Sequence, residues 1–257
     1  MTDSILQLDG VVKDFNKFRA VGGKDGLTFD VKRGGFLGLI GPNGAGKSTT
    51  FNLISGVLRP SMGKVTFDGV DLSPLNIAEI AALGLGRTFQ TPRAFESLNV
   101  IDNVMVGLAH AEESPMAALF GRWKPAERAL TGKAEAALER VGLIGRRHDA
   151  VSNLSGGELR MLEVARQLVR DPRILLLDEP TAGVDPTLQG KLSEILADLH
   201  ADGTTLIVVE HNLGFLMSLA DSVVVLQNGA LLAKGTPDDI RRDPHVIAAY
   251  LGADHEA

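Results

Sequence analysis

The segment Gly41–Thr49, with the sequence GPNGAGKST, has the clearest capacity for chemistry in this chain. Its spacing matches the phosphate-binding P-loop pattern, in which backbone N–H groups surround phosphate oxygens. Lys47 would reach the β- and γ-phosphates, and the Ser48 hydroxyl would bind Mg²⁺. Glycines let such a loop turn tightly and approach the anion closely. The sequence therefore predicts a phosphate site at Gly41, Pro42, Asn43, Gly44, Ala45, Gly46, Lys47, Ser48 and Thr49.

Two carboxylates end an apolar run later in the chain. Ile174–Leu177 is followed at once by Asp178 and Glu179. Parallel strands deliver functional groups at their carboxyl ends, so Asp178 is a candidate ligand of Mg²⁺. Glu179 is a candidate general base that orients or deprotonates an attacking water. Taken alone, the pair would equally suit an ordinary acidic turn.

A second segment suited to an anion is Ser155-Gly156-Gly157-Glu158. Ser155 and Glu158 have the spacing of a capping box, which predicts a helix N-terminus. Two glycines in the first turn of a helix cost about 1 kcal/mol each relative to alanine. They leave bare N–H groups at the positive end of the helix dipole, which favours an anion site over a purely structural cap.

Three further polar residues are weaker candidates. His211 follows a predicted strand, where it could contact a γ-phosphate, although a lone histidine at a strand end is more often structural. Gln90 could coordinate Mg²⁺ or water through its neutral side chain. Asp185 precedes Pro186, which favours a turn.

The elements that would position these residues alternate between strands and helices, as in a parallel sheet. Phe36–Ile40 is an apolar run that predicts a buried strand ending at the P-loop, and the segment 49–57 predicts the helix after it. Residues 13–20 are expected to form a turn, and Asn228-Gly229 predicts a hairpin. Other predicted strands are 5–12, 27–31, 64–67, 174–177, 205–209 and 222–226, and other predicted helices are 76–83, 99–109, 125–141, 155–170, 187–200, 213–219, 237–241 and 245–251.

The segment 93–170 differs from the rest because strand patterns vanish and Ala, Glu, Arg and Leu dominate. We expect it to form an inserted helical subdomain. Residues 1–92 and 171–257 would form the nucleotide-binding core together with an N-terminal antiparallel β subdomain. Arg87 and Arg93 are expected to be exposed positions near this boundary.

Bulk composition excludes several classes of protein. The chain has 257 residues, 44% of them hydrophobic, which is enough for a sizeable core. A net charge of −6 argues against a general nucleic-acid binder. There are no cysteines, so no disulfide framework or thiolate metal site exists. Without a signal peptide or an apolar run of about 18 residues, the expectation is a soluble cytoplasmic α/β protein.

Taken together, these motifs resemble those of the nucleotide-binding subunits of ABC transporters. GPNGAGKST, Gln90, LSGGE, ILLLDE, AGVD and His211 stand where that family has Walker A, Q-loop, signature, Walker B, D-loop and switch histidine. The resemblance covers almost the whole chain. It implies a P-loop NTPase (RecA-like) parallel-sheet core, an antiparallel β subdomain and an inserted α-helical subdomain.

The resemblance also implies how the site residues act. Two such subunits, as a homodimer or a heterodimer with a related ATPase, would sandwich two molecules of ATP with Mg²⁺. Ser155, Gly156 and Gly157 would contact the γ-phosphate held by the partner's P-loop, and Asp185 would lie at the same interface. Phe15 stands where the family places an aromatic residue against adenine, and it fits that position better than Phe18.

Finer features are similar to those of branched-chain amino acid transport ATPases: the stretch RTFQ, the insert EESPMAALFGRWKPAERAL and the ending GTPDDIRRDPHVIAAYLG. The ending also resembles the lipopolysaccharide-export ATPase, whereas the RTFQ stretch and the insert fit that protein less well. Two departures lie near the expected adenine side: Gly35 where the family usually has glutamate, and about three extra positions near Gly22–Lys24.

The sequence thus predicts an ATP-hydrolysing subunit of an importer for branched-chain amino acids or related amides, at the cytoplasmic face of the inner membrane. Integral-membrane permease subunits and an extracytoplasmic solute-binding protein would be its partners, with no nucleic acid. The nearest alternative is lipopolysaccharide export. A soluble P-loop ATPase acting on DNA or ribosomes is a rival from another class, and a nucleotide-gated subunit without turnover is a third.

Overall fold

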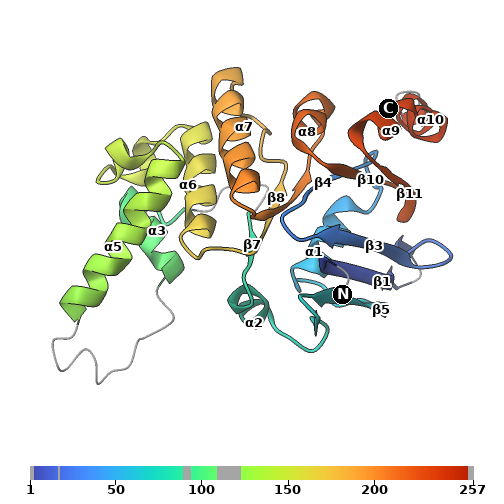
Figure 1. Ribbon diagram of the computed structural model, residues 1–257, viewed down its shortest axis with the longest axis horizontal. Coiled ribbons are helices and arrows are strands. Elements are labelled where there is room, and N and C mark those ends of the chain that lie inside the picture. Colours follow the sequence, from blue (N-terminus) through green and yellow to red (C-terminus); the bar gives the residue numbers. More distant parts are fainter. Residues whose placement is uncertain (1–2, 17, 89–93, 109–122, 254–257) are drawn as a thin grey trace. The chain divides into compact units, whose positions relative to one another are not determined.

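The computed structural model describes residues 3–16, 18–88, 94–108 and 123–253. Figure 1 shows the course of the chain through its strands and helices. The chain forms two compact units. The first comprises Met1–Arg87, Arg173–Pro180 and Ala197–Ala257, and the second comprises Thr88–Pro172 and Thr181–Leu196.

A mainly parallel sheet of six strands within the described residues forms the centre of the first unit. Its strand order is β11-β10-β4-β9-β8-β7, and β11 alone pairs antiparallel, with β10. Every residue of β4, β8 and β9 is buried, as expected for strands covered on both faces. The strands are β4 (Phe36–Ile40), β7 (Leu85–Arg87), β8 (Ile174–Asp178), β9 (Thr205–Val209), β10 (Ser222–Gln227) and β11 (Ala230–Gly235).

An antiparallel sheet accompanies it in the same unit. Its long strand β1 pairs with β2, β3 and β5, and β5 also pairs with β6. The pairing of β1 with both β3 and β5 shifts register near Gly10, whose φ of 57° marks a bulge. The strands are β1 (Ser4–Phe15), β2 (Phe18–Val21), β3 (Leu27–Lys32), β5 (Met62–Phe67) and β6 (Val70–Asp71).

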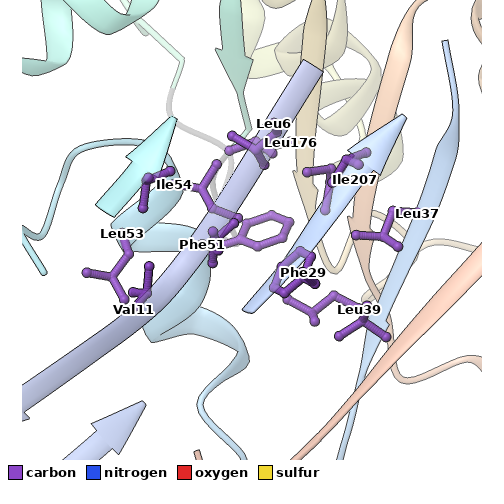
Figure 2. Close-up of a cluster of buried hydrophobic side chains, with 14 of the residues drawn as sticks. Leu6, Val11, Phe29, Leu37, Leu39, Phe51, Leu53, Ile54, Leu176 and Ile207 are labelled. Carbon is purple, nitrogen blue, oxygen red and sulfur yellow. The ribbon is translucent and has the colours of Figure 1, made fainter. Parts of the chain in front are cut away.

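Helix α1 (Lys47–Ile54) is buried among side chains of both sheets. Figure 2 shows Phe51 of α1 close to Phe29 of β3 within a cluster that also contains Leu39 of β4 and Leu176 of β8. Phe51 is fully buried, and burial of such a ring stabilises the fold by about 1.5–3 kcal/mol. This packing holds the start of α1, and therefore the P-loop, at the end of β4.

The first unit contains four further helices among the described residues, and two of them begin with a capping box. Asn76 caps α2 in a capping box with Glu79, and Thr236 caps α9 in the same way with Asp239. These helices are α2 (Ile77–Ala82), α8 (Leu213–Leu219), α9 (Pro237–Arg242) and α10 (Pro244–Ala253).

The second unit is helical. Helices α3, α5 and α6 contact one another pairwise, with Val104, Leu138 and Leu162 buried between them. The unit contains α3 (Val100–Met105), η1 (Val106–Leu108), α5 (Trp123–Arg140), η2 (Ile144–Arg146), η3 (Val151–Asn153) and α6 (Gly156–Leu168). Helix α7 (Pro186–Ala201) begins in this unit and ends in the first.

Most predicted elements are present, with ends that differ by a few residues. One expectation was wrong: residues 13–20 do not form a turn. Strand β1 continues to Phe15, the chain reverses at Asn16 with a φ of 52°, and β2 pairs Phe18 with Phe15. Strands β1 and β2 therefore form a hairpin. No helix in the part of the chain that the structure describes is long and apolar enough to cross a membrane.

Candidate functional site

The predicted P-loop, Gly41–Thr49, joins β4 to α1 at the carboxyl edge of the parallel sheet. Gly46 is the N-cap of α1, with a φ of 98° and no side-chain hydrogen bond to the first turn. Gly44 has a φ of 77°, so both positions need the left-handed backbone that glycine adopts readily. The helix N-terminus is therefore bare of side-chain acceptors, as an anion site requires.

The Lys47 ammonium lies inside this loop. Its Nζ donates to the carbonyl oxygens of Gly41 at 2.7 Å and Pro42 at 3.0 Å, and the residue is 6% exposed. Burial lowers the pKa of Lys47, while the charges of Glu179 and Asp178 oppose that shift. The loop thus holds a buried cation within the electrostatic reach of both carboxylates.

Both carboxylates end β8, beside β9 in the parallel sheet. Asp178 is buried, and Glu179 follows with a φ of 48° and an N–H that donates to Val209 at 2.9 Å. Glu179 Oε1 lies 2.9 Å from Nε2 of His211, which follows β9. The structure therefore brings Lys47, Asp178, Glu179 and His211 to one edge of the sheet.

The acidic residue before His211 has a different contact. Glu210 is 3% exposed, and its Oε2 accepts from the backbone N–H groups of His211 at 3.1 Å and Asn212 at 3.4 Å. Asn212 in turn caps α8. Glu210, which was not predicted as a functional residue, therefore fixes the backbone at His211.

The expectation that Arg87 is exposed was wrong. It ends β7 in the first unit, and its side chain is 13% exposed. Its Nη1 donates to Asn52 Oδ1 at 2.8 Å and Ser55 Oγ at 2.5 Å, and its Nη2 lies 3.7 Å from Asp178 Oδ2. The residues next to Arg87 in the sequence do not indicate these partners, because the partners come from distant parts of the chain.

The second unit contains the predicted capping box at the start of α6. Ser155 Oγ accepts from the Glu158 N–H at 3.3 Å, and Glu158 Oε2 accepts from the Ser155 N–H at 2.8 Å. Arg146 Nη1 contacts Glu158 Oε1 at 2.7 Å. Hydrogen bonds from Ser155 and the charge of Arg146 lower the pKa of Glu158, which favours the ionised carboxylate in the capping box.

The two glycines of α6 differ in their surroundings. A Cβ added at Gly157 would lie 2.2 Å from Leu188 Cδ1, the end of a side chain that can rotate, so Leu188 would have to shift to admit it. A Cβ at Gly156 would meet nothing within 4 Å, and both Gly156 and Ser155 are exposed. Gly157 therefore has a packing contact with Leu188, whereas a side chain at Gly156 would reach open space.

Asp185 has a local role. Its Oδ1 accepts from the N–H groups of Thr187 at 3.0 Å and Leu188 at 3.2 Å, at the start of α7. This is the turn that the sequence favoured. The side chain therefore orders the first turn of α7, and the residue is exposed.

Phe15 and Phe18 face each other at the end of the β1–β2 hairpin, and they are 43% and 67% exposed. Lys13 Nζ lies 5.2 Å from the Phe15 ring centroid. Both rings are thus open for contact with a flat ligand. Gln90 and Arg93 lie outside the described residues.

Tyr250 of α10 contacts the P-loop, which was not predicted from the sequence. Burial raises the pKa of its hydroxyl to about 12, and a hydrogen bond with the Gly41 backbone opposes this shift. The C-terminal helix therefore touches the first residue of the P-loop. Nothing in the local sequence around Tyr250 indicates this partner.

Comparison with known sequences decides the family. The sequence model of the family described as ABC transporter matches residues 24–182. A relative from Methanocaldococcus jannaschii is 34% identical over 98% of each chain, and one from Pseudomonas aeruginosa is 36% identical over 98% of this chain and 99% of its own. The chain belongs to the ABC transporter family.

The relatives of this cassette carry more specific names. The first is named a probable branched-chain amino acid transport ATP-binding protein LivG, and the second a high-affinity branched-chain amino acid transport ATP-binding protein BraF. A second family, described as branched-chain amino acid ATP-binding cassette transporter, matches residues 230–256.

Solved structures agree with the fold. An ATP-binding cassette of an ABC transporter, in its ADP conformation, is 34% identical, with a TM-score of 0.84 over 97% of this chain and 99% of that one. A component of a transporter complex from Clostridium perfringens is 26% identical, with a TM-score of 0.81. The predicted family, the predicted ABC cassette fold and the predicted assignment as a transporter ATPase are therefore confirmed.

Proposed function

We propose that this cassette hydrolyses ATP to energise the import of branched-chain amino acids. The observation that carries the proposal is the match of residues 230–256 to the family of branched-chain amino acid cassettes, beside full-length relatives with that named role. These relatives favour this function over lipopolysaccharide export. The solute itself could also be a related amide.

The P-loop holds the phosphates of ATP in this proposal. Lys47 exchanges the carbonyl oxygens of Gly41 and Pro42 for phosphate oxygens, because an ammonium pairs better with an anion than with neutral carbonyls. The bare N-terminus of α1 adds its dipole. Phe15, exposed at the hairpin end, stacks on adenine.

The donor set fits Mg²⁺. The Ser48 hydroxyl and the Asp178 carboxylate supply hard oxygen ligands, and Gln90 is proposed as a third. The described residues contain no group of three acidic, histidine or cysteine side chains that could hold a metal by themselves. Mg²⁺ is usually bound by one or two carboxylates together with substrate phosphates, and Asp178 would supply one carboxylate. The ion would neutralise charge on the transferred phosphoryl group.

Glu179 acts as the general base, and His211 holds it in place. Glu179 Oε1 accepts a proton from the attacking water, and its 2.9 Å contact with His211 Nε2 fixes the carboxylate. The left-handed backbone of Glu179 supports this role, since strained residues persist where the surrounding structure imposes them.

Two cassettes form composite sites, as a homodimer or with a related ATPase. Ser155 and Gly156 are exposed at a capped helix N-terminus, which suits contact with a γ-phosphate held by another chain. Asp185 orders the start of α7 beside the same helix, whose Gly157 packs on Leu188. Residues 93–170 then serve as the helical domain.

Permease subunits supply the membrane path, and an extracytoplasmic binding protein delivers the solute. The cassette binds to the cytoplasmic face of the inner membrane through those permeases. The contact lies in the helical domain and the segment around Gln90 and Arg93.

A complementation experiment tests this function. In a strain without the gene, the wild-type chain is expected to restore ATP-dependent uptake of labelled leucine, isoleucine or valine. Lys47→Ala, expressed at the same level, is expected not to. Uptake that does not depend on the gene, or that Lys47→Ala restores fully, would contradict the proposal.

A further inference from the structure

Arg87 is a mostly buried charge to which the proposed phosphate chemistry gives no role. It ends β7, where it is in register with Leu176 of the neighbouring strand β8. Burial lowers the pKa of Arg87, and the charge of Asp178 opposes that shift. Burying a guanidinium is costly unless partners compensate, so its contacts should have a role.

One side of the guanidinium is fixed to the helix after the P-loop. Nη1 donates to Asn52 Oδ1 at 2.8 Å and to Ser55 Oγ at 2.5 Å, at the end of α1. The guanidinium carbon also lies 5.9 Å from the ring centroid of Phe51, itself fully buried. These contacts determine where the charge sits, because two residues of α1 and its C-cap Ser55 hold it.

The other side of the guanidinium faces Asp178. Nη2 lies 3.7 Å from Asp178 Oδ2, beyond hydrogen-bonding distance, so the pair is mainly electrostatic. The Asp178 side chain is 9% exposed and that of Arg87 13%, so water screens the pair weakly. A protein cation therefore already stands beside the carboxylate proposed for the metal.

We propose that Arg87 is a positioning residue and a fixed counter-ion for Asp178, which reduces the dependence of ATP binding on Mg²⁺. This rests on the proposed role of Asp178. Without the metal, ATP brings about four negative charges toward a buried carboxylate, and the Arg87 charge offsets part of the repulsion. With the metal bound, the same repulsion is largely neutralised, and the Arg87 charge matters less.

A purely structural role predicts a different pattern. If Arg87 only supported the fold, its loss would weaken ATP binding equally with and without Mg²⁺. The informative quantity is thus the ratio of the dissociation constant for ATP in EDTA to that in MgCl₂. Hydrolysis does not enter this ratio, so it can be measured by calorimetry under conditions without turnover.

Three variants separate charge from packing. Arg87→Gln removes the charge, and Arg87→Lys keeps it. The control is Arg173→Gln: Arg173 also pairs with an aspartate, Asp68 at 2.6 Å, and lies 5.8 Å from the ring centroid of Phe67, but its side chain is 44% exposed. That pair belongs to the same unit but does not involve Asp178.

In the complete chain, Arg87→Gln is expected to raise the ratio at least tenfold, because one pair of unit charges roughly 10 Å apart at an effective dielectric of about 20 accounts for about that factor and Mg²⁺ neutralises more than one charge of ATP. Arg87→Lys should stay within about threefold of wild type, and Arg173→Gln should not change the ratio. If Arg87→Gln does not unfold cooperatively, Asn52→Ala loosens the anchor while keeping the charge and should raise the ratio about twofold to threefold.

An unchanged ratio in Arg87→Gln, or in Asn52→Ala where that variant is needed, would overturn the proposal. So would an equal rise in Arg173→Gln. If the wild-type chain fails to bind ATP under either condition, the proposed function of the cassette fails instead, and the two failures are distinguishable.

Discussion

Replacing Glu179 by glutamine changes the chemistry of the site with little change in shape. The amide oxygen of glutamine can still accept from His211 Nε2, which lies 2.9 Å from Glu179 Oε1. The Glu179 N–H bond to Val209 is a backbone contact and is unaffected. The substitution therefore removes the base and keeps the geometry around it.

The expected magnitude follows from the role of a general base. Loss of such a group lowers the rate by about 10²–10⁴, equivalent to about 3–5 kcal/mol of activation free energy. The free energy of unfolding should change by less than about 0.5 kcal/mol, because the principal contacts survive. ATP binding should persist, because the substitution removes one negative charge that repels the phosphate.

The assay combines phosphate release, thermal unfolding and size-exclusion chromatography with ATP. We expect Glu179→Gln to be nearly inactive, normally folded and trapped as an ATP-bound dimer. The chain offers a matched control in Asp221→Asn. Like Glu179, Asp221 pairs with a histidine: His200 Nε2 lies 3.0 Å from Asp221 Oδ2. Unlike Glu179, Asp221 accepts from the Phe36 N–H at the start of β4, which is the end of that strand away from the P-loop.

Asp221→Asn should therefore lower stability by about 1 kcal/mol and leave hydrolysis within about twofold of wild type. Two results would refute the reasoning about Glu179. One is a Glu179→Gln protein that hydrolyses ATP at the parent rate and stays monomeric. The other is an equal loss of hydrolysis in Asp221→Asn, which would attribute the effect to the fold.

Four further predictions address separate parts of the molecule. Lys47→Ala should weaken ATP binding and reduce phosphate release to background, and calorimetry with unaltered affinity would contradict the phosphate role. Ser155→Arg should abolish hydrolysis while ATP binding stays within about threefold, because the change lies across the dimer; joint loss of both would place Ser155 in its own site. Gly157→Ala should change the free energy of unfolding in denaturant by less than about 1 kcal/mol, because Leu188 Cδ1 can rotate away and alanine favours the helix; a loss above about 3 kcal/mol would contradict this. Arg93→Glu should reduce transport and spare basal hydrolysis, and unaffected transport would move the permease contact elsewhere.

The parts of the fold that were predictable depend on local pattern. Phe36–Ile40 and Thr205–Val209 were predicted with their observed bounds, because an unbroken apolar run suits a strand covered on both faces. The P-loop was predictable because its glycines and lysine are contiguous. Glu179 and His211 were each predicted as candidates from their position after a strand, and the parallel order of β8 and β9 brings them together.

The parts that were missed depend on distant partners. Strand β1 pairs with β3 and β5 up to Val12 and then continues into the hairpin with β2, and no local pattern shows these partners. Arg87 was predicted to be exposed because its partners Asn52, Ser55 and Asp178 are distant in the sequence and approach it only in the folded chain. Folding likewise brings Leu188 onto Gly157, which gives that glycine a packing role.

The central claim is that ATP hydrolysis by this cassette drives import of branched-chain amino acids. Its most direct test is the ATPase rate of the complete transporter in proteoliposomes, with and without binding protein loaded with leucine, isoleucine or valine. We predict that the loaded binding protein stimulates hydrolysis, that labelled solute accumulates in step with it, and that Lys47→Ala abolishes both. A hydrolysis rate that is the same with and without the loaded binding protein, with no accumulation of solute, would contradict the account.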